Sequence, residues 1–115
     1  MSDVAPADVP VPGQLVVDTR TDRGTIVLSL QGELDLTSAP VFERELRNAE
    51  SAGPSRVVID LAGLEFMDST GLRALLLARE LAHSDGYALM LRRGPRQVQR
   101  VLELTKTVDA FAFED

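Results

Sequence analysis

Residues 56–78 read RVVIDLAGLEFMDSTGLRALLLA, and this stretch decides the fold. Its opening, residues 56–64, is apolar and does not alternate with polar residues, which is typical of a central strand covered on both faces. Residues 68–84 then predict a helix, so that Asp-Ser-Thr-Gly falls where the strand gives way to the helix. A buried strand followed at once by a helix predicts an α/β domain.

The segments before this stretch predict a hairpin. LVVDTRT (15–21) and TIVLSLQG (25–32) are short and rich in β-branched residues, which is typical of strands. Residues 22–24, which include a glycine, supply the turn between them.

A first helix is predicted after the hairpin. Thr37 or Ser38 can cap it, and Pro40 fits its first turn, where a missing N–H group does little harm. Gly53 and Pro54 end it. Four residues recur at helical spacing and share one apolar face: Ala39, Phe42, Leu46 and Ala49.

The segments after residue 84 continue the alternation. YALMLRR (87–93) predicts another buried strand, PRQVQRVLELTK (95–106) a third helix, and AFAF (110–113) a short final strand. Strands that alternate with helices pair in parallel through right-handed crossovers. The predicted fold is therefore α/β, a small mixed sheet of about four to five strands packed with three to four helices.

Composition limits the possible functions. The 115 residues carry a formal net charge of -6 and contain no cysteine. The negative charge argues against nucleic acid as a partner, and the lack of cysteine excludes disulfides and thiolate metal sites. No run approaches the roughly 20 apolar residues of a membrane span, and the start does not resemble a secretory signal. These features predict no membrane partner and a cytoplasmic location.

The N-terminal segment MSDVAPADVPVPG, residues 1–13, is predicted to be a flexible, proline-rich tail. It combines prolines with small and acidic residues and buries too little apolar area to offset its ordering entropy. Residues 14–115 are predicted to form one domain, as expected for a chain of this length.

The turn from Asp68 to Gly71 occupies a predicted helix N-terminus, where backbone N–H groups lack partners and carry partial positive charge. One interpretation is plain capping, in which Asp68 or Ser69 accepts an N–H bond worth about 1 kcal/mol. The other is a modification site, because Gly71 is a poor helix residue whose missing side chain leaves the Ser69 hydroxyl accessible. Helix N-termini bind anions, so the fold would tolerate a phosphate there.

Catalysis by Ser69 is not expected. The sequence has no Gly-x-Ser-x-Gly elbow, and its only histidine, His83, lies about 20 Å farther along the helix, too far for proton transfer. No Gly-x-x-x-x-Gly-Lys loop occurs, so another protein must hold any phosphoryl donor. Asp35, Asp60 and Asp68 lack the spacing of a metal site. We expect no catalytic residues, no metal and no cofactor.

The helix after the turn is more apolar than one sheet face requires. Arg73, Glu80 and Ser84 form a narrow polar stripe, and apolar residues fill nearly all the remaining surface. Either this helix is wedged between the sheet and a neighbouring helix, or Leu72 and Leu76 stay exposed beside the turn as part of an interface.

Two segments carry a resemblance to a known family: VVIDLAGL with the FMDSTGLRALL that follows it, and GELDLTSA (32–39). They resemble the STAS domain family, and specifically the small bacterial anti-sigma factor antagonists. The resemblance spans roughly residues 15–113. It implies a STAS-like fold and a regulator of transcription that is not an enzyme.

The family's phosphorylated serine aligns with Ser69, so the resemblance implies partner switching. The unmodified protein binds an anti-sigma factor that is also an ATP-dependent serine kinase, and the sigma factor is released. Phosphorylation ends this binding and a serine phosphatase restores it. The expected partner-binding residues are Asp35, Asp68, Ser69, Thr70, Gly71, Leu72 and Leu76.

Two other functions fit parts of the sequence. A constitutive STAS scaffold subunit of a stress-sensing or lipid-transport assembly would use Ser69 only as a helix cap, and its complexes would not respond to phosphorylation. A serine hydrolase would require a general base that the sequence does not provide.

Overall fold

The computed structural model describes residues 14–114, in which helices and strands alternate after an opening hairpin. The predicted tail, residues 1–13, lies outside the described residues. The elements follow in the order β1 (Leu15–Asp22), β2 (Thr25–Leu34), α1 (Ala39–Ser51), β3 (Arg56–Met67), α2 (Ser69–Asp85), β4 (Ala88–Arg92), α3 (Arg96–Leu104), a 3₁₀ turn (Val108–Ala110) and β5 (Ala112–Phe113).

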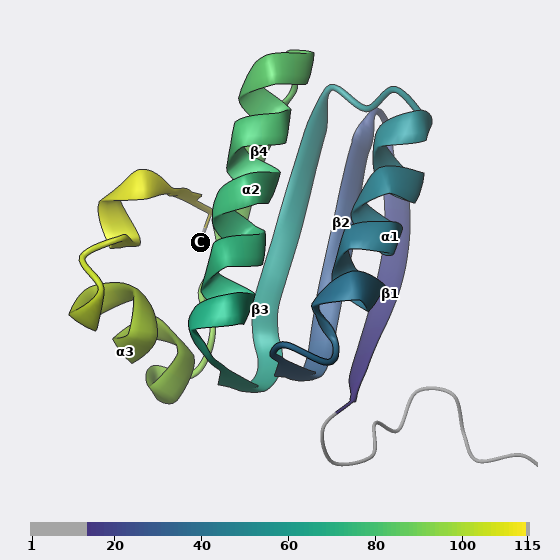
Figure 1. Cartoon of the computed structure of the whole chain (residues 1–115). Helices are drawn as coiled ribbons and strands as arrows, with labels where there is room; N and C mark the ends of the chain where they lie inside the picture. The colour runs from purple at the N-terminus through teal and green to yellow at the C-terminus, as the bar shows by residue number, and fades with distance from the viewer. Residues whose placement is uncertain (1–13, 115) are drawn as a thin grey trace, which may run out of the picture.

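The five strands form one mixed sheet in the order β1-β2-β3-β4-β5. β1 and β2 are antiparallel, and each later pair is parallel. α1 and α2 lie side by side over one face of the sheet (Figure 1). The predicted α/β fold class is confirmed. Because β2 and β3 run in parallel, their carboxyl ends meet at one edge, and both lead into a helix there.

The core lies between the sheet and its helices. The residues of α1 that were predicted to share an apolar face are its buried ones, and Phe42 is completely enclosed. Val57, Val58 and Ile59 of β3 are also fully buried, which confirms that this strand is covered on both faces where its run is continuous. Hydrophobic periodicity located the core of this half of the chain correctly.

Several boundaries differ from the sequence prediction. β3 extends to Met67, so Asp68 is the residue before α2 and Ser69 is its first residue. β4 is shorter than predicted, and only Leu91 of its five residues is fully buried. It lies next to the two-residue strand β5 near the sheet edge, where less of the protein covers it. α3 ends at Leu104, and the 3₁₀ turn after it was not predicted.

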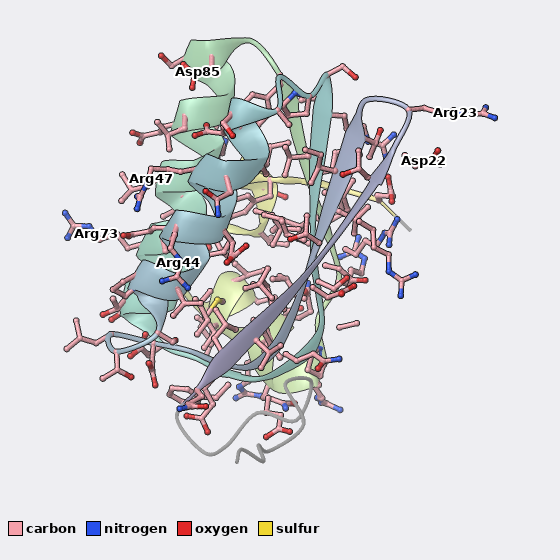
Figure 2. All side chains as sticks on the ribbon, turned by 90° about the vertical axis from the view of Figure 1, so that its right-hand side faces the viewer. Asp22, Arg23, Arg44, Arg47, Arg73 and Asp85 are labelled. Carbon is pink, nitrogen blue, oxygen red and sulfur yellow. The ribbon has the colours of Figure 1, made fainter. Side chains whose placement is uncertain are left out.

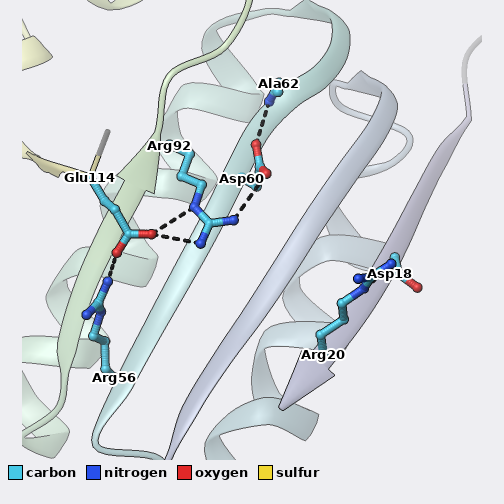
Figure 3. A network of polar contacts seen from close by, with 7 residues as sticks. All are labelled: Asp18, Arg20, Arg56, Asp60, Ala62, Arg92 and Glu114. Atoms are coloured by element: carbon cyan, nitrogen blue, oxygen red, sulfur yellow. Dashed lines mark hydrogen bonds and ion pairs between the residues drawn. The ribbon is translucent and has the colours of Figure 1, made fainter. Parts of the chain in front are cut away.

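The face of the sheet opposite α1 and α2 carries a chain of ion pairs (Figure 3). Arg92 Nε and Nη2 each lie 2.8 Å from Glu114 Oε2, and Arg92 Nη1 lies 3.6 Å from Asp60 Oδ2. Arg56 also pairs with Glu114. These contacts connect the residue after β5 to β3 and β4, which holds the short final strand against the sheet.

Within residues 14–114, no helix is both long and apolar enough to span a bilayer.

Candidate functional site

The candidate site lies at the edge where β2 and β3 end. Leu34 and Met67 are paired at the ends of these strands, and the Asp68 N–H donates to the Leu34 carbonyl at 3.4 Å. This pairing brings Asp35, which follows Leu34, to the same edge as Asp68 and Ser69. Asp35 and Asp68, both predicted to be partner-binding residues, therefore follow the ends of adjacent strands.

Asp68 caps α2, and Ser69 does not. The Asp68 backbone is extended, and its carboxylate accepts a hydrogen bond from the Gly71 N–H at 2.9 Å. Ser69, the first residue of the helix, is exposed, and its hydroxyl makes no hydrogen bond with the rest of residues 14–114. Of the two capping possibilities, the structure supports Asp68, and this leaves the Ser69 hydroxyl free at a helix N-terminus that favours anions. Thr70 beside it is half-buried.

Gly71 has a different role from the one predicted. It is buried, and a Cβ atom built on it would lie 2.3 Å from the Leu34 carbonyl oxygen and 2.9 Å from Cγ of both Leu34 and Met67. The space of its missing side chain is filled by the ends of β2 and β3. The expectation that Gly71 opens access to Ser69 was wrong, because the glycine instead allows α2 to approach the strands.

Asp35 organises the turn between β2 and α1. Its Oδ1 accepts hydrogen bonds from the Thr37 N–H at 3.1 Å, the Thr37 hydroxyl at 2.9 Å and the Ser38 N–H at 3.1 Å. The hydrogen bond from the Thr37 hydroxyl is the largest cause of a lowered pKa of Asp35, and together with the bonds from Ser38 and the Thr37 backbone it outweighs the opposing effect of desolvation. Asp35 is therefore a carboxylate at neutral pH and is fixed in position.

Ser38 was one of two predicted caps of α1. It occupies the capping position, but its hydroxyl makes no capping bond. The hydroxyl donates to the Glu33 carbonyl at 2.7 Å and accepts from the Asp35 N–H at 2.9 Å. The Asp35 carboxylate instead serves the N–H groups that precede the helix. An aspartate that follows a strand end thus accepts backbone N–H bonds in each turn, but only Asp68 caps a helix.

Asp35→Asn is expected to flatten the acid side of the pH–stability curve. Because the pKa of Asp35 is lowered on folding, the native protein binds this proton less tightly than the unfolded chain, whose aspartate pKa is about 3.9. The stabilisation is complete above about pH 4 and is lost as pH falls through the lower native pKa. The free energy of unfolding in urea, measured from about pH 2 to pH 6, should fall more steeply with decreasing pH for the unmodified protein than for Asp35→Asn. Equal slopes for both proteins would contradict the assignment.

Of the two possibilities for α2, the structure supports the helix wedged between the sheet and its neighbours and contradicts an exposed Leu72. Its side chain is only 6% exposed and Leu76 is half-buried, because α2 packs against both the sheet and the neighbouring helices. The apolar side chains that do face solvent at this edge are Leu36, 72% exposed, and Phe66, 46% exposed. Sequence reasoning missed both. The available signal was a leucine within the polar turn Asp35–Ser38, where no core position is expected.

Comparison with family models adds the deciding observation. The STAS domain model matches residues 16–115. The chain belongs to the STAS domain family. This STAS domain is 30% identical over 103 residues to the anti-sigma-F factor antagonist RsfB of Mycobacterium tuberculosis, a match that covers 88% of this chain and 84% of RsfB.

Solved structures of anti-sigma factor antagonists share the fold. An anti-sigma factor antagonist from Mycobacterium paratuberculosis matches this STAS domain with a TM-score of 0.74 at 25% identity, covering 95% of this chain and 87% of the other. The Bacillus protein SpoIIAA matches with TM-scores of 0.71 in its unphosphorylated form and 0.65 in its phosphorylated form. Both SpoIIAA matches are 19% identical, covering 86% of this chain and 88% and 91% of the SpoIIAA chains, and they show the fold alone.

Proposed function

We propose that this STAS domain is an anti-sigma factor antagonist regulated by phosphorylation of Ser69. The observation that carries the proposal is the free, exposed Ser69 hydroxyl at the start of α2. Because Asp68 caps this helix, the Ser69 hydroxyl is not needed as a cap. The relatives named as anti-sigma factor antagonists support the class of protein. The protein acts by binding in the cytoplasm and not as an enzyme.

In the proposed cycle, the unphosphorylated protein binds an anti-sigma factor that is also an ATP-dependent serine kinase, and the sigma factor is released. The kinase transfers the γ-phosphoryl group of ATP to the Ser69 oxygen, which loses its proton, and ADP leaves. A serine phosphatase later hydrolyses the phosphate ester and restores the hydroxyl. Ser69 thus serves as both a contact and the point of control.

The proposed contact surface surrounds Ser69. Leu36 and Phe66 offer apolar area at the strand ends, and an exposed apolar side chain next to a polar centre is typical of a protein interface. Thr70, Asp68 and Asp35 supply the polar part. Leu76 contributes its half-exposed side chain at most, and the buried Leu72 and Gly71 support the surface from below without reaching the partner.

Phosphosite mapping tests this proposal. The chain is incubated with ATP and each candidate anti-sigma kinase of its source, alongside Ser69→Ala and the control Ser84→Ala, which removes an exposed hydroxyl near the other end of α2. We expect one phosphate on Ser69, none on Ser69→Ala and an unchanged yield on Ser84→Ala. Phosphate incorporated equally by all three proteins would contradict the site. A stable complex that never incorporates phosphate would instead indicate a static scaffold.

A further inference from the structure

An apolar groove runs between α1 and α2, away from the Ser69 edge. Its volume is about 440 Å³, and Figure 2 shows the two helices lying together on one side of the sheet. Phe42, Leu46, Ala74 and Ala78 are buried and form its floor. The groove therefore presents a surface made almost entirely of carbon.

Two leucines of α2 line this groove and face solvent. Leu77 is 47% exposed and Leu81 is 41% exposed, and they lie one turn apart on the same helix face. Leu77 lies roughly 12 Å along the helix axis from Ser69. The proposed contact surface around Ser69 does not account for them. Adjacent exposed leucines beside an apolar groove are typical of an interaction site.

The shape of this surface is complementary to itself. Leu77 and Leu81 form a ridge at i, i+4 spacing, and Ala74 and Ala78 form a parallel row of small residues at the same spacing. Helices pack by placing such ridges into neighbouring grooves. A second copy of α2 that crosses this face can place its leucine ridge over the alanine row, while its own groove receives the first ridge. A two-fold dimer requires this reciprocal match.

The charges at the rim are also reciprocal. Glu43 and Arg47 of α1 and Glu80 of α2 border the groove, and none of the three forms an ion pair within residues 14–114. A two-fold axis brings every rim residue opposite the rim of the other copy, so a surface with both signs can pair with itself. Arg47 on one wall and Glu80 on the other are placed to pair across such an interface.

We propose that the groove between α1 and α2 is the interface of a homodimer of this chain. Its centre is the interlocked pair of Leu77–Leu81 ridges, and Arg47 of each copy pairs with Glu80 of the other. The Ser69 edge lies beyond the interface and stays accessible in both copies. The dimer does not depend on the proposed function of Ser69.

The available area indicates a weak dimer. α2 has 17 residues and α1 has 13, so the longer helix is about 26 Å long. Two helices side by side are about 20 Å wide, which gives a contact face of about 500 Å² against the roughly 800 Å² per partner of a standard interface. We expect dissociation in the micromolar range, which makes the oligomeric state depend on concentration.

Sedimentation velocity from about 1 μM to about 1 mM tests the dimer with the full chain. We expect a shift from monomer to dimer, lost in Leu77→Glu because a carboxylate would enter an apolar contact. The matched control is Leu104→Glu, which changes a leucine that is 70% exposed on α3 and should leave dimerisation unchanged. Circular dichroism checks that all variants fold.

A charge exchange adds a test that does not alter the apolar surface. Arg47→Glu and Glu80→Arg should each weaken the dimer by about threefold to tenfold, and the double variant should regain the original affinity. Sedimentation as a monomer at every concentration would overturn the proposal, as would a dimer unaffected by Leu77→Glu. A monomer that binds the apolar dye ANS only when Leu77 is intact would also overturn it, because the groove would then accept a small apolar ligand.

Discussion

Phosphorylation of Ser69 is expected to weaken binding to the anti-sigma factor by about 100-fold or more, equivalent to about 2.8 kcal/mol. The phosphate adds between about -1.5 and -2 charges at the centre of the proposed contact. It lies at the same edge as the carboxylates of Asp68 and Asp35, both held in place by hydrogen bonds. A partner surface that fits the neutral hydroxyl would have to remove water from the phosphate. It would also face the combined negative charge of the phosphate and the two carboxylates.

Isothermal titration calorimetry with the phosphorylated and unphosphorylated chains measures this effect. Asp35→Asn provides a matched control, because it removes one of the neighbouring charges and should recover part of the lost affinity of the phosphorylated form. The recovery should shrink at high salt, where exposed charges are screened. Affinities within threefold of each other for the two forms would show that Ser69 is not the switch.

Gly71→Ala is expected to destabilise the fold by about 1–3 kcal/mol, the usual penalty for overpacking. In an exposed helix the same change stabilises by up to about 1 kcal/mol, so the sign of the result is informative. Here the added methyl would lie 2.3 Å from the Leu34 carbonyl oxygen, and backbone cannot move aside as a flexible side chain does. α2 would have to shift away from β2 and β3.

The free energy of unfolding in urea measures the effect of Gly71→Ala. Ser69→Ala is the matched control in the same helical turn, because its side chain is exposed and makes no bond within residues 14–114. We expect it to change stability by less than about 0.5 kcal/mol. A Gly71→Ala protein as stable as the control would mean that α2 does not pack as closely against Leu34 as described.

The fold could be predicted from sequence because its signals are local. The spacing of Phe42 and Leu46 on one helix face, and the apolar, non-alternating pattern of β3, depend only on residues near them in the chain. The strand-to-helix turn could be located for the same reason, and with it Asp68 and Ser69.

The details of the site depend on contacts between distant segments. Gly71 of α2 contacts Leu34 of β2, which is distant in sequence, so the glycine was given the wrong role. A helical projection places Leu72 on a face but does not show what covers that face, and the structure buries it. The exposure of Leu36 and Phe66 follows from how β2 and β3 end together. Local periodicity contains none of this information.

The tight contact between Gly71 and Leu34 has a consequence for how fast a signal can pass through this protein. The start of α2 is wedged against two strand ends, and hydrogen bonds hold the carboxylates on both sides of it. Hydrogen bonds to Asp35 also hold the turn before α1, so we expect the phosphate to act through its charge and not through a change of shape. We expect the two forms to have superimposable backbones. The response time is then set by the rates of phosphorylation, dephosphorylation and partner release, because the fold itself undergoes no slow rearrangement.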